Sequence, residues 1–205
     1  MHHHRRGDPC GRPHSNKPQR KSIRLKNHDY SQSGCYFITL CVQHKKYLFG
    51  NVSNDEMKLN AAGTMVQHAW VDLKNKFNNI EIDAYIVMPN HLHGIIIIPN
   101  NDPVGATLVV AHIDDTHKPS QTIGNIIGAF KSITTNKYIR EVRNNNFAPF
   151  DKILWQRNYY EHIIRDDEAF YKIREYIFNN PSNWGKDVMS QEKILKINKH
   201  REKME

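Results

Sequence analysis

The sequence predicts an α+β fold in which an antiparallel sheet carries helices on one face. Segments rich in β-branched and aromatic residues alternate with segments whose apolar residues recur every three or four positions. Two of the predicted strands are separated only by a short turn, which makes them antiparallel neighbours. The length of 205 residues suits one domain with appendages.

The first strand is predicted at 35–42, where aromatic and β-branched residues follow Ser33-Gly34. The next pattern indicates a helix. Residues 53–56 read Ser-Asn-Asp-Glu, the pattern of a capping box. Apolar residues then keep helical spacing: Leu59, Ala62, Val66, Ala69, Leu73 and Phe77. We therefore expect a helix that begins at this capping box and ends near Phe77.

A β-hairpin is predicted after this helix. Residues 80–87 alternate between polar and apolar side chains, and residues 88–90 form a tight turn. Residues 91–98 then form a third strand that ends in four consecutive isoleucines. The first residues of this strand, including His91 and His93, should lie at an end of the sheet beside the turn.

The second half of the chain predicts two more helices and one strand region. One helix runs from Ser120 to about Arg140 and is ended by three asparagines at 144–146. A fourth strand region falls within 153–164, with a bend at 157–158. The last helix begins after the acidic residues 166–168 and is stopped by Pro181. The polar segment 99–119 is assigned neither a structure nor a role.

The predicted order is β-α-β-β-α-β-α. Its first six elements match the split βαβ or ferredoxin-like plan, and the C-terminal helix, which carries Tyr176, is added to it. The sheet face without helices in this plan commonly binds single-stranded nucleic acid. The fold alone does not define a function.

The charge of the chain predicts a polyanionic partner. The net charge is +8, and residues 1–30 hold eight Arg and Lys residues against two Asp. We expect a flexible basic arm at 1–30, a domain at 31–185 and a polar basic tail at 186–205. No apolar run has the length of a membrane helix, and no signal-peptide core is present. The three cysteines lack metal-site spacing, so a reducing cytoplasm is expected.

His91 and His93 form a candidate metal-binding pair. Alternate residues of a strand share one face, so the two imidazoles lie about 6–7 Å apart on the same side. Such a pair can bind one divalent ion. The alternative is a polar strand end next to a turn, and the two residues by themselves do not decide between these interpretations.

The last helix offers a nucleophile and a third ligand. Tyr176 and Asn180 are four residues apart, which places them on one face of a helix. Tyr171 and Glu175 have the same spacing, so spacing does not select between the pairs. Tyr176 could also be a packing residue, and Tyr159 and Tyr160 could stack on nucleobases.

Three blocks resemble the signature motifs of the REP-associated tyrosine transposases, single-tyrosine members of the HUH endonuclease and transposase superfamily. They are VMPNHLH at 87–93, WQRNYYEHIIR at 155–165 and EYIFNNP at 175–181. Shorter similarities lie at 22–25 and 128–132, so the resemblance extends from about Ser22 to Gly185. The three blocks occur in the order found in that family.

The resemblance implies a set of residue roles. His91, His93 and Asn180 would bind Mg²⁺ or Mn²⁺, and Tyr176 would be the nucleophile. The implied reaction is cleavage and rejoining of single-stranded, hairpin-containing DNA through a 5′-phosphotyrosine intermediate. The 155–165 block receives no chemical role, and a structural strand and turn is its simpler interpretation.

Charge and resemblance together predict the partners. Six basic residues are expected to contact DNA phosphates: Arg20, Lys21, Arg24, Lys131, Lys137 and Arg140. We expect a monomer in the nucleoid of the cytoplasm, with a dimer as the alternative. Two other functions stay open: a non-catalytic protein that binds single-stranded nucleic acid, and a metal-dependent nuclease that uses water.

Overall fold

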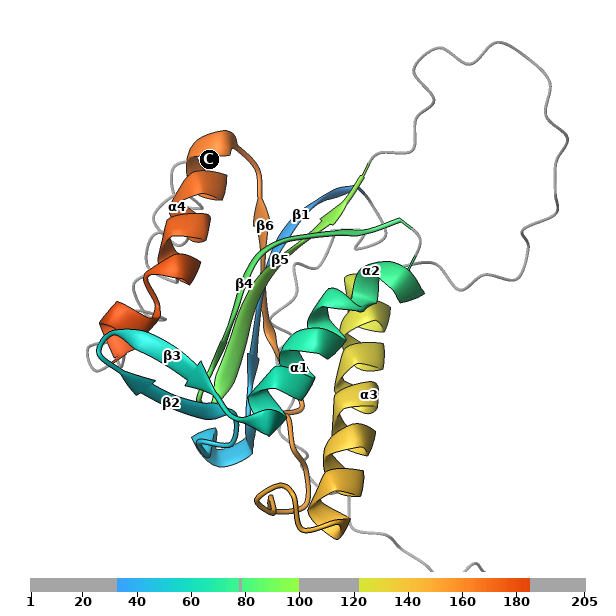
Figure 1. Ribbon diagram of the computed structural model, residues 1–205. Coiled ribbons are helices and arrows are strands. Elements are labelled where there is room, and N and C mark those ends of the chain that lie inside the picture. The colour runs from blue at the N-terminus through green and yellow to red at the C-terminus, as the bar shows by residue number, and fades with distance from the viewer. Residues whose placement is uncertain (1–32, 78, 100–121, 185–205) are drawn as a thin grey trace, which may run out of the picture.

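The computed structural model describes residues 33–77, 79–99 and 122–184. Figure 1 shows its helices and strands. In chain order they are β1 (Gly34–Cys41), η1 (Gln43–Lys45, a 3₁₀ turn), β2 (Gly50–Ser53), β3 (Glu56–Leu59), α1 (Ala61–Val71), α2 (Leu73–Lys76), β4 (Glu81–Met88), β5 (His91–Ile98), α3 (Ile123–Arg143), β6 (Tyr160–Ile164) and α4 (Asp167–Phe178).

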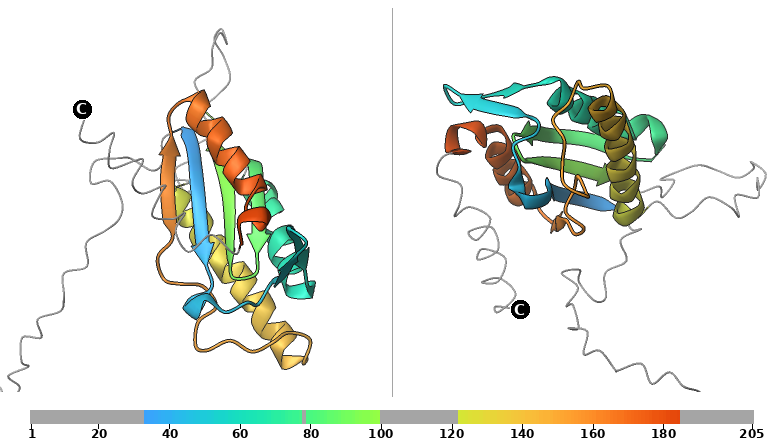
Figure 2. Two further views of the ribbon diagram at one scale, coloured as in Figure 1. Left: turned by 90° about the vertical axis from the view of Figure 1, so that its left-hand side faces the viewer. Right: turned by 90° about the horizontal axis from the view of Figure 1, so that it is seen from below.

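Four strands form the main sheet in the order β4-β5-β1-β6, and every neighbouring pair is antiparallel. With β1, β4, β5 and β6 as its first to fourth strands, this is the ferredoxin-like arrangement. The predicted α+β class is therefore confirmed. α1 and α3 lie together on one face of the sheet, whereas α4 lies on the other (Figure 2).

Large apolar side chains fill the space between the sheet and the two helices α1 and α3. On β5, Leu92, Ile96 and Ile98 point to this face and are buried. Gly94 lies between them because the indole of Trp70 occupies the space beside it. A Cβ atom at Gly94 would lie 2.5 Å from Trp70 Cζ2. The absence of a side chain at this position lets α1 pack directly on the strand.

The opposite face carries a smaller apolar cluster beneath α4. Its buried members are Phe37, Ala84, Ile95, Ile164 and Ile177. α4, the C-terminal helix added to the ferredoxin-like plan, packs on this face and covers part of it. The helix begins at the predicted acidic segment, where the Asp166 side chain accepts a hydrogen bond from Ala169 N.

The predicted helix start at residues 53–56 was wrong. Residues 50–59 form the β2–β3 hairpin, with Asn54 and Asp55 in its turn at φ values of 54° and 58°. Asn and Asp tolerate this left-handed conformation, which two-residue hairpin turns require. α1 begins at Ala61 instead, and the Asn60 side chain accepts a hydrogen bond from Gly63 N. A break at Asp72 separates α1 from α2.

The remaining predictions hold with shifted limits. α3 begins after its cap at Thr122 and ends at Arg143, before Asn144. The predicted strand region at 153–164 contains only β6 and an isolated bridge between Trp155 and Val42. The arm at 1–30, nearly all of 99–119 and the tail at 186–205 lie outside the described residues. None of the described helices is long and apolar enough to cross a membrane.

Candidate active site

The two histidines at the start of β5 lie on the α4 side of the sheet. Their ring centroids are 4.5 Å apart, and both side chains are buried. The β1–β5 register places His91 beside Cys41 and His93 beside Thr39. The predicted shared face is confirmed.

His93 is held between the sheet and α4. Its Nδ1 lies 2.8 Å from Thr39 Oγ1, and its Nε2 lies 3.3 Å from the hydroxyl of Tyr176. The ring also stacks on Phe37 at 5.4 Å between centroids. Tyr176 contacts Phe37 and His93 edge to face, so two aromatic neighbours orient the phenol toward the histidine.

His91 presents a nitrogen that has no hydrogen-bond partner. Its Nδ1 lies 2.7 Å from Asn90 Oδ1, an oxygen that can only accept. We infer that Nδ1 carries the proton and that Nε2 has the free lone pair. Nε2 is buried without a partner. A hydrogen bond at Nδ1 that leaves Nε2 available is the usual arrangement of a metal-binding histidine.

Asn180 adjoins His91 and has two unpartnered polar atoms. The residue is 1 % exposed, and neither its Oδ1 nor its Nδ2 has a partner in hydrogen-bond geometry, although the amide lies close enough to His91 to raise the pKa of that imidazole. Asn180 lies just beyond the end of α4. It precedes Pro181, and a proline disfavours helical geometry at the residue before it. The predicted spacing along one helix face therefore did not determine its position. The turn that follows α4 turns the amide inward.

Burial keeps both imidazoles neutral. It lowers the pKa of His91 to about 4, a shift that the neighbouring Asn180 amide opposes and the charge of Lys45 reinforces. Burial, followed by the proximity of His91, lowers the pKa of His93 well below its ordinary value. Neutral imidazoles are the form that binds metal ions.

The donor set fits a divalent cation that keeps open positions. No three His, Cys, Asp or Glu side chains gather in the parts of the chain that the structure describes. The ligands available here are two imidazoles and one amide. A buried polar atom without a partner costs about 1–3 kcal/mol, and three such atoms on His91 and Asn180 lie in one place. A cation would pair with two of these atoms, His91 Nε2 and Asn180 Oδ1.

An ion pair holds α4 against the sheet of its own chain. Arg174 Nε lies 3.3 Å from Asp83 Oδ1 on β4, and its guanidinium lies over the ring of Phe170. Ile177 is fully buried in the cluster beneath the helix. These contacts place Tyr176 beside His93 within one chain.

The 155–165 block has structural contacts. Trp155 packs on Phe49 and Phe130, and its Nε1 donates a hydrogen bond to Thr134 Oγ1. Lys131 donates to the carbonyls of residues 156, 157 and 158. Burial lowers the pKa of Lys131 to about 8, so it stays charged at neutral pH. These contacts give residues 155–158 a structural role and engage Lys131, a predicted phosphate contact.

The other predicted residues are not gathered at the site. Lys137 and Arg140 are exposed on α3, on the sheet face opposite α4. Arg20, Lys21 and Arg24 lie outside the described residues. Tyr171 is 66 % exposed on α4.

Sequence reasoning missed the residues that orient the histidines. Thr39 and Asn90 contact the Nδ1 atoms of His93 and His91, and the indole of Trp184 stacks on His91 at 5.8 Å between centroids. A register for β1 against β5 would have identified Thr39. No sequence pattern pointed to Trp184.

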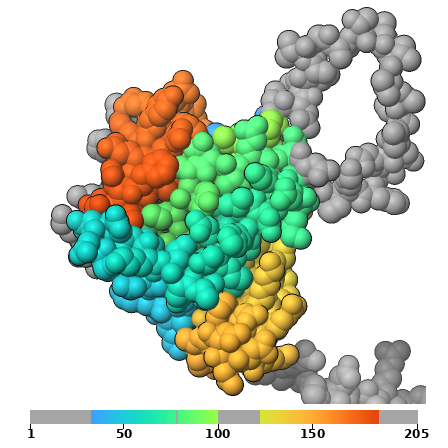
Figure 3. All heavy atoms as spheres, in the orientation of Figure 1, coloured from blue at the N-terminus to red at the C-terminus, as the bar shows by residue number. Residues whose placement is uncertain are grey.

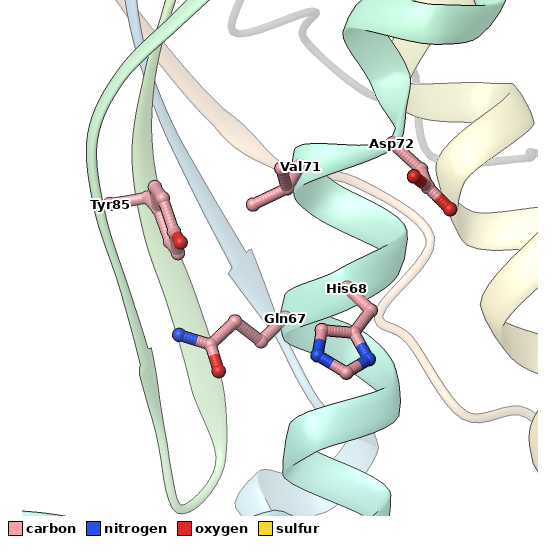
Figure 4. A pocket seen from close by; sticks show the side chains of 5 residues that line it. All are labelled: Gln67, His68, Val71, Asp72 and Tyr85. Carbon is pink, nitrogen blue, oxygen red and sulfur yellow. The ribbon is translucent and has the colours of Figure 1, made fainter.

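A hollow lies on the face of the sheet that α1 and α3 cover, away from the histidine site. It has a volume of about 530 Å³ and lies between α1 and β4 (Figure 4). Gln67, His68 and Val71 line it from α1, Asp72 lines it from the break after α1, and Tyr85 lines it from β4. None of these side chains belongs to the histidine site.

Comparison with known proteins gives the relatives of this chain. No family model matches it. An uncharacterised protein of Haemophilus influenzae is 43 % identical over 174 residues, which cover 83 % of this chain and 92 % of that protein. A candidate REP-associated tyrosine transposase of Haemophilus influenzae is 25 % identical over 162 residues, 77 % of this chain and 75 % of that protein.

A solved structure has the same fold. It is a REP-associated tyrosine transposase bound to a REP hairpin, with a TM-score of 0.51 and 20 % identity. The match covers 80 % of this chain and 75 % of that one. The chain thus belongs to the same family as the 43 % identical Haemophilus protein, and it is related in sequence and in fold to the REP-associated tyrosine transposases.

Proposed function

We propose that this protein is a transposase that cleaves and rejoins single-stranded, hairpin-containing DNA through Tyr176. The contact between the Tyr176 hydroxyl and His93 Nε2, at 3.3 Å, carries the proposal. It puts a candidate nucleophile next to a buried pair of neutral histidines. The hairpin-bound relative supports hairpin DNA as the substrate.

The residues of the chain would divide the reaction between them. The phenolic oxygen of Tyr176 forms a bond to phosphorus while the bond from phosphorus to the 3′ oxygen breaks. The departing 3′ oxygen takes up a proton, which balances the proton that the phenol loses. Bound by His91, His93 and Asn180, Mg²⁺ or Mn²⁺ would supply charge neutralisation at the phosphate. The phosphotyrosine bond retains the energy needed for rejoining.

The supporting scaffold has a defined part in this scheme. Thr39 and Asn90 orient the imidazoles through their Nδ1 atoms. The Asp83–Arg174 pair keeps the tyrosine helix on its own sheet, which favours a site built within one chain and a protein that acts as a monomer.

A covalent-adduct assay tests the proposal. Labelled single-stranded hairpin DNA is incubated with Mn²⁺ and the full chain, then separated on a denaturing gel. Wild type and Tyr171→Phe should give a protein–DNA adduct, because Tyr171 is exposed and away from the histidines. Tyr176→Phe should reduce the adduct by about three orders of magnitude or more, since the nucleophile is lost.

Two results would contradict the proposal. Cleavage that survives in Tyr176→Phe and leaves no adduct would identify a nuclease that uses water. Binding of the hairpin without any cleavage by wild type would identify a non-catalytic binding protein.

A further inference from the structure

Two aromatic rings lie in series outside His91. The indole of Trp184 stacks on the His91 ring at an interplanar angle of 26°, and the phenol of Tyr47 contacts this indole at 5.4 Å between centroids. Tyr47 lies between η1 and β2, and Trp184 lies just after α4. The β2–β3 hairpin and the end of α4 meet at the same corner of the molecule (Figures 1 and 3).

Packing in the core does not explain why a ring as large as that of Tyr47 lies on the surface. Its side chain is 66 % exposed, whereas its neighbours Leu48 and Phe49 are buried. Trp184 is half-buried, while Trp70 and Trp155 are at most 4 % exposed. Two large rings next to the histidine site therefore keep surface that water can reach.

The backbone on both sides of Tyr47 is tied by hydrogen bonds to the turn before β5. Val42 N donates to Asn90 O, and the amides of Leu48 and Phe49 both donate to Pro89 O. The Asn90 side chain also donates to Lys45 O at 3.2 Å. The segment that carries the ring is thus attached to the turn that begins β5. A platform held in this way loses little conformational entropy when it binds a ligand.

Positive charge accompanies the two rings. Lys45 and Lys46 directly precede Tyr47, and both are exposed. The charge of Lys45 reaches the site, since it adds to the effect of burial in lowering the pKa of His91. Exposed aromatic rings beside cations form the usual binding surface for single-stranded nucleic acid, in which bases stack and phosphates pair with the charges.

We propose that Tyr47 and Trp184 form a stacking site for an unpaired nucleobase next to the phosphate that the histidine site binds. The inference rests on the proposed function for the nature of the substrate. It adds residues that none of the three sequence motifs contains. The simpler alternative is that the rings only shield His91 from water.

Intrinsic fluorescence provides a direct measurement. The chain has three tryptophans, and Trp184 is the one that is not deeply buried. DNA hairpins with and without a short unpaired flank are titrated into the full chain in EDTA, so that no cleavage occurs. The flanked hairpin should quench the fluorescence of wild type more strongly than the blunt hairpin. Trp184→Phe should abolish this difference.

Affinity provides the matched comparison. Tyr47→Ala should weaken binding of the flanked hairpin by about tenfold, within the range of about five- to a hundredfold for a lost stacking contact. Tyr47→Phe should bind as wild type does. Tyr171→Ala is the control, because Tyr171 has the same exposed fraction of 66 % and also contacts one neighbouring ring. It should leave the affinity unchanged.

The outcomes separate this inference from the proposed function. If Tyr47→Ala binds the flanked hairpin as wild type does while wild type still forms the Tyr176 adduct, only the stacking site is refuted. If the quenching depends on the flank and Tyr47→Ala weakens binding, the stacking site stands even when no adduct forms. A Tyr47→Ala variant that loses thermal stability but binds normally would identify a shielding role and overturn the inference.

Discussion

The two faces of the sheet use the same strands, but only the face under α4 brings several unpartnered buried polar atoms together in the part of the chain that the structure describes. The face under α1 and α3 is an apolar core around Trp70 and Phe130, in which the indole Nε1 of Trp70 is an isolated buried atom without a partner. The face under α4 has a smaller cluster and holds His91, His93 and Asn180. Unpartnered polar atoms cost stability, so a protein retains them together where a ligand uses them. The difference separates a face that maintains the fold from a face that carries the candidate site.

The largest expected effect is a loss of stability from a substitution in the face under α1 and α3. Trp70→Ala should lower the free energy of unfolding by about 3–5 kcal/mol, because it leaves a cavity between α1, α3 and Gly94. Ile177→Ala, in the α4 cluster, should instead release α4 locally. Urea unfolding measures the first change, and hydrogen exchange in α4 against β1 and β5 measures the second. Equal global destabilisation by both variants would show that the two faces unfold as one unit.

A smaller effect depends on pH and comes from the second face. The folded-state pKa of His91 is about 4, whereas an unfolded histidine titrates near 6.5. Between these values the unfolded chain binds more protons, so stability should fall as the pH drops from about 6.5 to about 4. His91 alone would contribute up to about 3 kcal/mol, and His93 shifts in the same direction. Thermal melts across this range should show a shallower dependence for His91→Gln. An unchanged slope in that variant would contradict the assignment.

The smallest effect has the opposite sign. Asn180→Leu should raise the free energy of unfolding by about 1–2 kcal/mol without divalent cations, because it removes two buried atoms that lack partners. The same variant should lose any rise in melting temperature that Mn²⁺ gives wild type. Asn51→Leu is the control on an exposed asparagine and should change stability by at most about 0.5 kcal/mol. Destabilisation by Asn180→Leu would mean that the amide has a structural partner.

Periodicity and local signals predicted most elements of the fold. The four strands of the main sheet, the helix α3 and the helix α4 after Asp166 follow from side-chain alternation, helical spacing and capping residues. The shared face of His91 and His93 follows from the two-residue period of a strand. These features depend on neighbouring residues, so the sequence contains them directly. Resemblance to the three motifs then singled out Tyr176 and Asn180, which spacing alone did not.

Long-range contacts decided the rest. The sequence at 53–56 fits a capping box, but in the structure these residues belong to a hairpin. β2 and β3 pair across a turn at Asn54 and Asp55. The path of α4 across the second sheet face depends on the ion pair between Arg174 and Asp83 and on the packing of Ile177 in the cluster that contains Phe37. These contacts join distant parts of the chain. The stacking of Trp184 on His91 is likewise a contact between residues far apart in the chain. Sequence by itself determined which residues alternate and where α3 and α4 begin. Only tertiary packing determined which side chains meet, since such contacts join residues far apart in the chain.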